Sequence, residues 1–145
     1  MITDKAPHKI NIRLVHFLPP EWHPQSAIQL TWPHEETDWS ALLDEAIVCF
    51  VEIAKEISKR QKLLIVCPDV SKTKGDLKDC NQENIILVQC DSNDTWARDH
   101  GGIVVIEKGN PVVLDFGFNG WGGKYPADKD NKITKLLFEK GAFAS

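Results

Sequence analysis

The spacing of apolar residues along the chain predicts five β-strands separated by polar segments. Apolar and polar residues alternate at 27–32, and apolar residues run almost without interruption at 63–67, 85–90, 102–107 and 112–114. Pro33 and Pro68 follow the first two runs directly, and proline cannot continue a central strand. Short runs that end at such breakers are typical of buried or half-buried strands.

A period of 3.6 residues predicts a helix at 40–60. Thr37 or Asp38 could cap its N-terminus, and acidic residues lie at its start while basic residues lie at its end, as the helix dipole favours. A second helix is predicted to begin near Asp130. Residues 69–82 show little periodicity, which predicts a loop with a short helical turn. One long helix among several strands predicts an α/β domain.

Length, composition and charge narrow the class of protein. The 145 residues fit one soluble domain, with 42% hydrophobic and 26% charged residues. A net charge of −4 argues against nucleic acid as a partner, and the lack of an apolar run of about 18 residues argues against a membrane span. The N-terminal segment has no apolar block typical of a secretory signal, so we expect a cytoplasmic protein.

The four cysteines are expected to be reduced and mostly buried thiols. They form no C-x-x-C pair, and none lies near a histidine at metal-ligand spacing, so we expect no metal and no cofactor. The segment 34–36, His-Glu-Glu, could touch a metal, but a solvated loop is the simpler interpretation.

The densest polar chemistry lies in the segment 93–99, Asn-Asp-Thr-Trp-Ala-Arg-Asp, between two apolar runs. Trp96 and Asp99 are three residues apart, so in a turn they could face one ligand. A guanidinium ion suits such a pair, because it forms two parallel hydrogen bonds to a carboxylate and stacks on an indole. The alternative is internal: Asp94 or Asp99 pairs with Arg98, while Trp96 fills a gap in the core. The segment 118–123, Phe-Asn-Gly-Trp-Gly-Gly, adds Trp121 as a second candidate wall of a cation pocket.

Three segments give the chain a resemblance to a known family. They are Pro20-Glu21-Trp22 followed by 30–33 (Leu-Thr-Trp-Pro) and 38–39 (Asp-Trp), then 93–99, and finally 115–123 (Asp-Phe-Gly-Phe-Asn-Gly-Trp-Gly-Gly). In this order they resemble the agmatine deiminases, a family that also includes the Porphyromonas-type peptidylarginine deiminases. The resemblance implies an α/β pentein, a propeller of five ββαβ units, of which this chain would supply only the first units. It implies an N-terminal extension at 1–18 and the N-terminal part of a truncated deiminase domain at 19–145.

The resemblance also implies a reaction and roles for single residues. A cysteine thiolate of the family attacks the guanidinium carbon of agmatine, a histidine shuttles protons, and N-carbamoylputrescine and ammonia are formed, a step of putrescine and polyamine metabolism. Asp99 matches a catalytic aspartate that holds the guanidinium, and Trp96 and Trp121 would contact the same substrate. The supporting residues would be Asn93, Asp94 and Arg98.

Some features depart from the family's pattern. The nucleophilic cysteine, the histidine and a second aspartate belong to a later region that this chain lacks, so we expect it to be inactive alone. Gly102 replaces a proline, Phe116 a tryptophan and Gly120 an alanine, which we expect to loosen the loop around Asp99.

Three functions stay open at this point. The chain is the N-terminal part of a guanidine deiminase that acts on agmatine, arginine or peptidyl-arginine, or a non-catalytic module that binds guanidinium ligands, or a structural fragment that needs a missing half. The expected partner is a small cationic guanidinium compound, and homo-oligomerisation of a full-length protein is left open.

Overall fold

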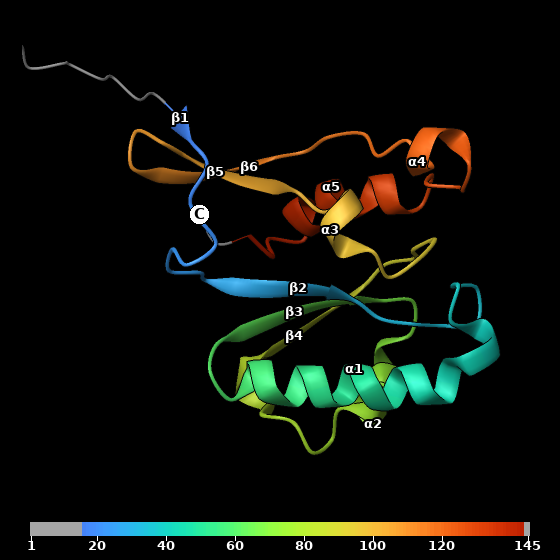
Figure 1. The fold of residues 1–145 in the computed structure, drawn as a ribbon. Coiled ribbons are helices and arrows are strands. Elements are labelled where there is room, and N and C mark those ends of the chain that lie inside the picture. The colour runs from blue at the N-terminus through green and yellow to red at the C-terminus, as the bar shows by residue number, and fades with distance from the viewer. Residues whose placement is uncertain (1–15, 144–145) are drawn as a thin grey trace, which may run out of the picture.

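The computed structural model describes residues 16–143, which form two three-stranded sheets and the helices that flank them (Figure 1). The first sheet is parallel, in the order β2 (Ala27–Thr31), β3 (Lys62–Cys67) and β4 (Ile85–Gln89). The second is antiparallel, with β5 (Ile103–Glu107) between β1 (His16–Phe17) and β6 (Asn110–Leu114). All five predicted strands are confirmed; β1 was missed because a two-residue strand carries no periodicity.

Helix α1 (Leu43–Ser58) connects β2 to β3 and covers one face of the parallel sheet (Figure 1). The predicted helix is therefore confirmed, with Asp44 and Glu45 in its first turn and Lys55 in its last. Its apolar stripe packs on a core of buried residues: Trp32, Ala54, Leu63, Ile65, Cys67, Leu77 and Cys80.

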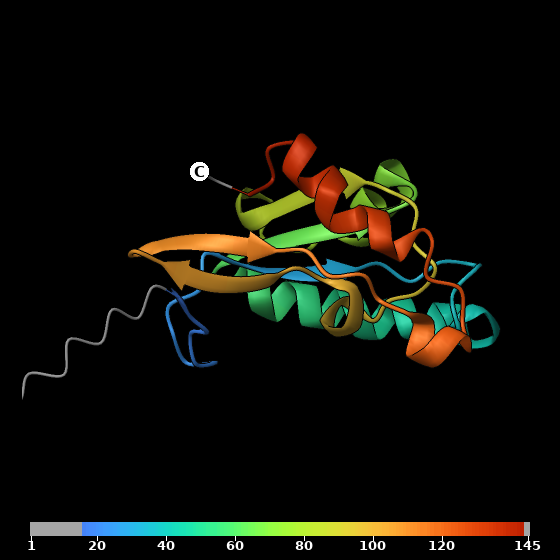
Figure 2. The ribbon, with the colours of Figure 1, turned by 90° about the horizontal axis from the view of Figure 1, so that it is seen from above.

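Helix α5 (Ile133–Glu139) lies on the opposite face, preceded by a 3₁₀ turn at Asp130–Lys132 (Figure 2). The second helix predicted near Asp130 is thus confirmed. It closes a second core, formed by Leu64, Val66, Val88, Cys90, Ile133 and Leu137. Because side chains of β3 alternate between the two cores, every residue from Leu63 to Cys67 is buried, which explains the uninterrupted apolar run of this central strand.

One local prediction was wrong, and another underestimated a helix. Neither Thr37 nor Asp38 caps α1, because a 3₁₀ turn at Ser40–Leu42 precedes the helix, and the Thr37 hydroxyl donates to the His34 carbonyl at 2.7 Å. The segment 69–82 contains a helix of two turns, α2 (Val70–Asp76), and a 3₁₀ turn at Gln82–Asn84.

Helix α2 begins where Asp69 accepts a hydrogen bond from the Lys72 N–H group at 2.9 Å. Its buried side is formed by Val70, Thr73 and Leu77, which have helical spacing. The polar Thr73 concealed this period in the sequence, so that only a short helical turn was predicted.

The prediction for the cysteines is confirmed at three positions. All four thiols are free, and Cys67, Cys80 and Cys90 are buried, whereas Cys49 is exposed on α1. Within residues 16–143, no helix is long and apolar enough to cross a membrane, and no cluster of three or more metal-binding side chains is present. Of the predicted extension at 1–18, residues 1–15 lie outside the described part of the chain, and residues 16 and 17 form β1.

Candidate functional site

The segment predicted to carry the chemistry leaves the carboxyl end of β4 and ends in a single helical turn, α3 (Ala97–His100). Trp96 precedes this turn, and its carbonyl accepts the N–H group of Asp99 at 2.9 Å. A turn therefore links the backbones of Trp96 and Asp99, and that their side chains face one ligand stays a prediction. Trp96 is 42% exposed, and the exposed Asp99 carboxylate forms no hydrogen bond or ion pair with another residue of the described range.

Arg98 does not pair with Asp94 or Asp99, contrary to the internal alternative. Its side chain is 90% exposed and lies 3.9 Å from Glu21, the nearest carboxylate that it reaches. Trp96 is not a core residue either, because it lies among other exposed aromatic rings. The structure therefore contains neither contact of the internal alternative: Arg98 does not pair with Asp94 or Asp99, and Trp96 does not fill a gap in the core.

Five aromatic side chains gather around Trp96, and we call them the aromatic cluster: Trp39, Trp96, Phe118, Trp121 and Tyr125. The ring centroid of Trp96 lies 6.3 Å from that of Trp39 and 6.4 Å from that of Trp121. Trp121 in turn lies 5.3 Å from Phe118 and 5.4 Å from Tyr125, both edge to face. The indole of Trp39 donates to the Thr95 hydroxyl at 2.9 Å. The sequence identified only Trp96 and Trp121 of this cluster as site residues.

An unusual backbone conformation holds Trp121 in the cluster. Its φ of 53° is left-handed, which is rare for a residue with a side chain and costs about 1–2 kcal/mol. Gly120 before it has φ of 60°, and a Cβ atom there would collide with the Tyr125 carbonyl oxygen. Gly120 is therefore required by this turn and does not loosen it.

Gly102 is also enclosed rather than loose. A Cβ atom at Gly102 would collide with Cγ1 of Val113 and lie 3.1 Å from Cγ2 of Thr134. The expectation that glycine loosens the loop at this position is wrong, because strand β6 and helix α5 fill the space around it.

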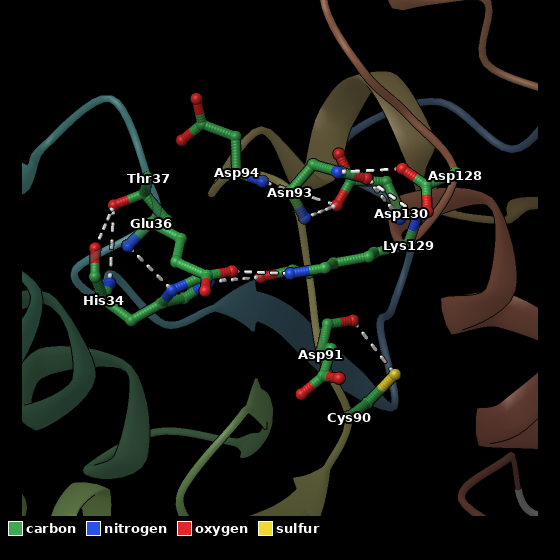
Figure 3. A network of polar contacts seen from close by, with 11 residues as sticks. His34, Glu36, Thr37, Cys90, Asp91, Asn93, Asp94, Asp128, Lys129 and Asp130 are labelled. Carbon is green, nitrogen blue, oxygen red and sulfur yellow. Dashed lines mark hydrogen bonds and ion pairs between the residues drawn. The ribbon is translucent and has the colours of Figure 1, made fainter.

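A reciprocal pair of polar residues, Asn93 and Asp130, joins the site segment to the start of α5 (Figure 3). The Asn93 side-chain oxygen accepts the N–H groups of Lys129 at 2.8 Å and of Asp130 at 3.1 Å. In return, the Asp130 carboxylate accepts the N–H groups of Asn93 at 2.7 Å and of Asp94 at 3.4 Å. Asp130 is only 3% exposed, so these bonds replace its contacts with water. We call this pair the 93–130 clasp.

The Asp94 carboxylate turns toward its own backbone and accepts the Thr95 N–H group at 2.7 Å. Its charge also raises the pKa of Asp38 above the usual value, mainly by repulsion, with a smaller effect of burial. Two neighbouring carboxylates therefore add negative potential near Trp39, where a cation would relieve their repulsion.

His34 is buried rather than in the solvated loop predicted from the sequence. Its Nδ1 accepts the Glu36 N–H group at 3.3 Å, and its Nε2 lies 3.1 Å from the Ser92 hydroxyl (Figure 3). Burial lowers the pKa of His34. The side chain borders a small cavity together with residues such as Asp91 and Lys129, but neither Trp96 nor Asp99 lines that cavity. Neither cavity found in the described residues includes Asp99 or a residue of the aromatic cluster.

The sequence model of the Porphyromonas-type peptidyl-arginine deiminase family matches residues 17–144. A Shewanella baltica protein named "Putative agmatine deiminase" is 31% identical over 134 residues, which is 88% of this chain and 36% of that protein.

Solved structures agree with this match. The C. jejuni C315S agmatine deiminase with substrate bound superposes with a TM-score of 0.80 at 38% identity, over 86% of this chain and 37% of that one. An arginine deiminase structure from Porphyromonas gingivalis, whose assignment is marked "Putative", gives a TM-score of 0.79 at 48% identity, over 87% and 37%. The chain spans little more than a third of the length of these relatives.

Proposed function

Because the chain belongs to the Porphyromonas-type peptidyl-arginine deiminase family, we propose that it carries the guanidinium-binding wall of a guanidine deiminase. The predicted α/β fold, the first units of a pentein, is confirmed by the same structural relatives. In this proposal Asp99 holds the guanidinium nitrogens, Trp96 stacks on the planar cation, and Trp121 closes the side of the site.

The single observation that supports the proposal best is the exposed Asp99 carboxylate, unpaired among the described residues, in the turn that begins at the partly exposed Trp96. A planar cation with several N–H donors matches both surfaces, since its edge binds the carboxylate while its face lies on a ring. The carboxylates of Asp38 and Asp94 favour a positive ligand further. Asn93 supports the site through the 93–130 clasp, and Arg98 keeps its proposed supporting role although its side chain points to solvent.

Hydrolysis of the guanidinium needs more than this wall. The overall reaction adds water to the guanidinium carbon, breaks one C–N bond, and leaves a ureido group and ammonia. A thiolate that attacks this carbon must be exposed and close to the ligand. Burial raises the pKa of Cys67, Cys80 and Cys90, and Cys49 lies on α1, on the far side of the parallel sheet (Figure 1). We therefore propose that the 145-residue chain binds guanidinium weakly and does not cleave it.

Agmatine is the substrate that we propose for the complete enzyme, because several relatives carry that name. Arginine and peptidyl-arginine are the alternatives within the same reaction. Four free thiols support a cytoplasmic location.

A non-catalytic guanidinium-binding module is the second candidate. It is favoured by one observation: within this chain alone, Trp96 contacts Trp121 and also accepts the N–H group of Asp99. The two candidates differ in affinity. An exposed ion pair contributes about 0–1 kcal/mol and each exposed cation–π contact about 0.5–1 kcal/mol, which together is less than the ~4 kcal/mol of a millimolar complex. Calorimetric binding of agmatine tighter than millimolar would therefore favour the module.

An NMR titration of the 145-residue chain tests the proposed site. Methylguanidinium should shift the Trp96 indole and Asp99 amide signals, whereas methylammonium at the same concentration and ionic strength should not. The variant Asp99→Asn should lose the selective shift, because its neutral amide keeps the shape but not the charge. Equal shifts with both cations, or an unaffected variant, would reject Asp99 as the guanidinium ligand. Formation of ureido product from agmatine by the chain alone would reject the proposed lack of activity.

A further inference from the structure

We propose that His100 is a positioning residue, whose bond to Thr31 fixes the turn that presents Asp99 to the ligand. The inference rests on the proposed function, because it gives a purpose to the orientation of Asp99. His100 is the last residue of the turn and is only 2% exposed, so we assign it an indirect role and no contact with the ligand.

The anchor point belongs to the buried parallel sheet. Thr31 is the last residue of β2, is fully buried, and pairs in register with Val66 of the central strand. The N–H group of the next residue, Trp32, still donates to the Val66 carbonyl at 2.8 Å. The Thr31 hydroxyl lies 3.4 Å from Nε2 of His100. This contact links the turn to the parallel sheet through a residue that lies 69 positions before His100 in the sequence.

The turn transmits this constraint to Asp99 because it is so short. The N–H groups of Asp99 and His100 both reach the Trp96 carbonyl, at 2.9 and 3.4 Å. A rotation of the His100 backbone therefore moves Asp99 as well. The chain that leaves His100 is equally confined, since a Cβ atom at Gly101 would collide with the Ala97 carbonyl oxygen. His100 thus fixes the end of a turn that has little freedom elsewhere.

The two ring nitrogens of His100 have different surroundings. Nε2 has Thr31 as its partner, whereas Nδ1 is buried without a hydrogen-bond partner among the described residues. Burial lowers the pKa of His100, although the nearby carboxylates of Asp130, Asp99 and Asp94 raise it. The neutral ring therefore has one polar contact to lose. A side chain that replaces only Nε2 should keep the function, and one that replaces only Nδ1 should not.

Matched variants of the 145-residue chain test this asymmetry. Glutamine can place its amide nitrogen at the position of Nε2, asparagine can place it at the position of Nδ1, and leucine removes both. Thr31→Val and Thr31→Ser form the second pair: valine keeps the shape of threonine without the hydroxyl, and serine keeps the hydroxyl. The valine variant leaves the imidazole in place, so it tests the contact even if a change at His100 unfolds the chain.

Two measurements decide the result. The first is the methylguanidinium-dependent shift of the Trp96 indole, and the second is the exchange rate of the Asp99 amide hydrogen without ligand. We expect His100→Leu, His100→Asn and Thr31→Val to weaken the apparent affinity at least fivefold and to speed exchange at least tenfold. His100→Gln and Thr31→Ser should stay within twofold of the unchanged chain in both measurements.

The inference would be overturned if Thr31→Val kept both properties, or if His100→Gln failed as badly as His100→Leu. If the unchanged chain shows no guanidinium-specific shift, the proposed function fails. The exchange rates then still confirm or refute the anchoring of the turn by Thr31 and His100.

Discussion

The 93–130 clasp gives the most direct test of how the site segment is held. Asn93→Ala removes three hydrogen bonds: the side-chain oxygen loses the N–H groups of Lys129 and Asp130, and the side-chain nitrogen loses the carboxylate of Asp128 at 3.2 Å. At about 0.5–1.5 kcal/mol for each of the two bonds to backbone N–H groups, with little from the exposed bond to Asp128, the expected loss of unfolding free energy is about 1–3 kcal/mol. This is a large part of the 5–15 kcal/mol that is typical of a domain.

Asp130→Ala attacks the same junction from the other side. It leaves the N–H groups of Asn93 and Asp94 without their carboxylate partner, and bonds to a charged acceptor contribute about 1.5–3 kcal/mol each. The two substitutions remove one shared contact surface, so the double variant should lose at least about 1 kcal/mol less than the sum of the single losses.

Urea unfolding monitored by circular dichroism measures these losses in the unchanged chain, the two single variants and the double variant. Asp128→Ala is the matched control, because its exposed carboxylate has one bond to Asn93 and its midpoint should hardly change. The reasoning would be refuted if Asn93→Ala unfolded at the same urea concentration as Asp128→Ala. Strict additivity of Asn93→Ala and Asp130→Ala would show that the two residues act separately.

Three further predictions concern single features of the fold. Gly120→Ala should destabilise the chain by roughly 2 kcal/mol or more, because the new Cβ atom meets the Tyr125 carbonyl at a left-handed φ; an unchanged urea midpoint would contradict this. Burial lowers the pKa of His34 and His100 in the folded chain from 6.5, so below this pH the unfolded chain binds more protons than the folded chain. The free energy of unfolding should therefore fall as the pH is lowered, by up to ~1.4 kcal/mol per pH unit for each histidine. Urea midpoints that stay level between about pH 7.5 and 5.5 would contradict this. A thiol reagent should modify Cys49 rapidly in the folded chain, and the other three cysteines only after unfolding. Mass spectrometry can identify the labelled thiols. Rapid labelling of a buried thiol would contradict the packing.

Much of the fold could be predicted because periodicity is a local property. Five strands and α1 followed from the spacing of apolar residues, and the separation of Trp96 and Asp99 predicted a shared turn. Helix α2 was predicted only as a short helical turn, because the polar Thr73 occupies a buried position of its stripe. The cap of α1 was wrong because an intervening 3₁₀ turn moved the helix start beyond Thr37.

The supports of the site could not be predicted, because they join distant parts of the chain. His100 reaches Thr31 across 69 residues, and Asn93 reaches Asp130 across 37. Neither pair has a sequence spacing that marks it as a pair. Trp39 appeared in the sequence only as part of the family resemblance, and its contact with Thr95 depends on how the loop before α1 folds back.

These long-range supports also have a kinetic consequence. A contact that closes a long loop forms only after the chain has lost much of its freedom, so the turn at Ala97–His100 cannot become ordered by itself. The parallel sheet must assemble before Thr31 is available, and α5 must dock before Asp130 meets Asn93. Ordering of the aspartate-bearing turn should therefore be one of the last steps of folding. The same turn should be among the first to open when α5 frays, while both hydrophobic cores are still intact.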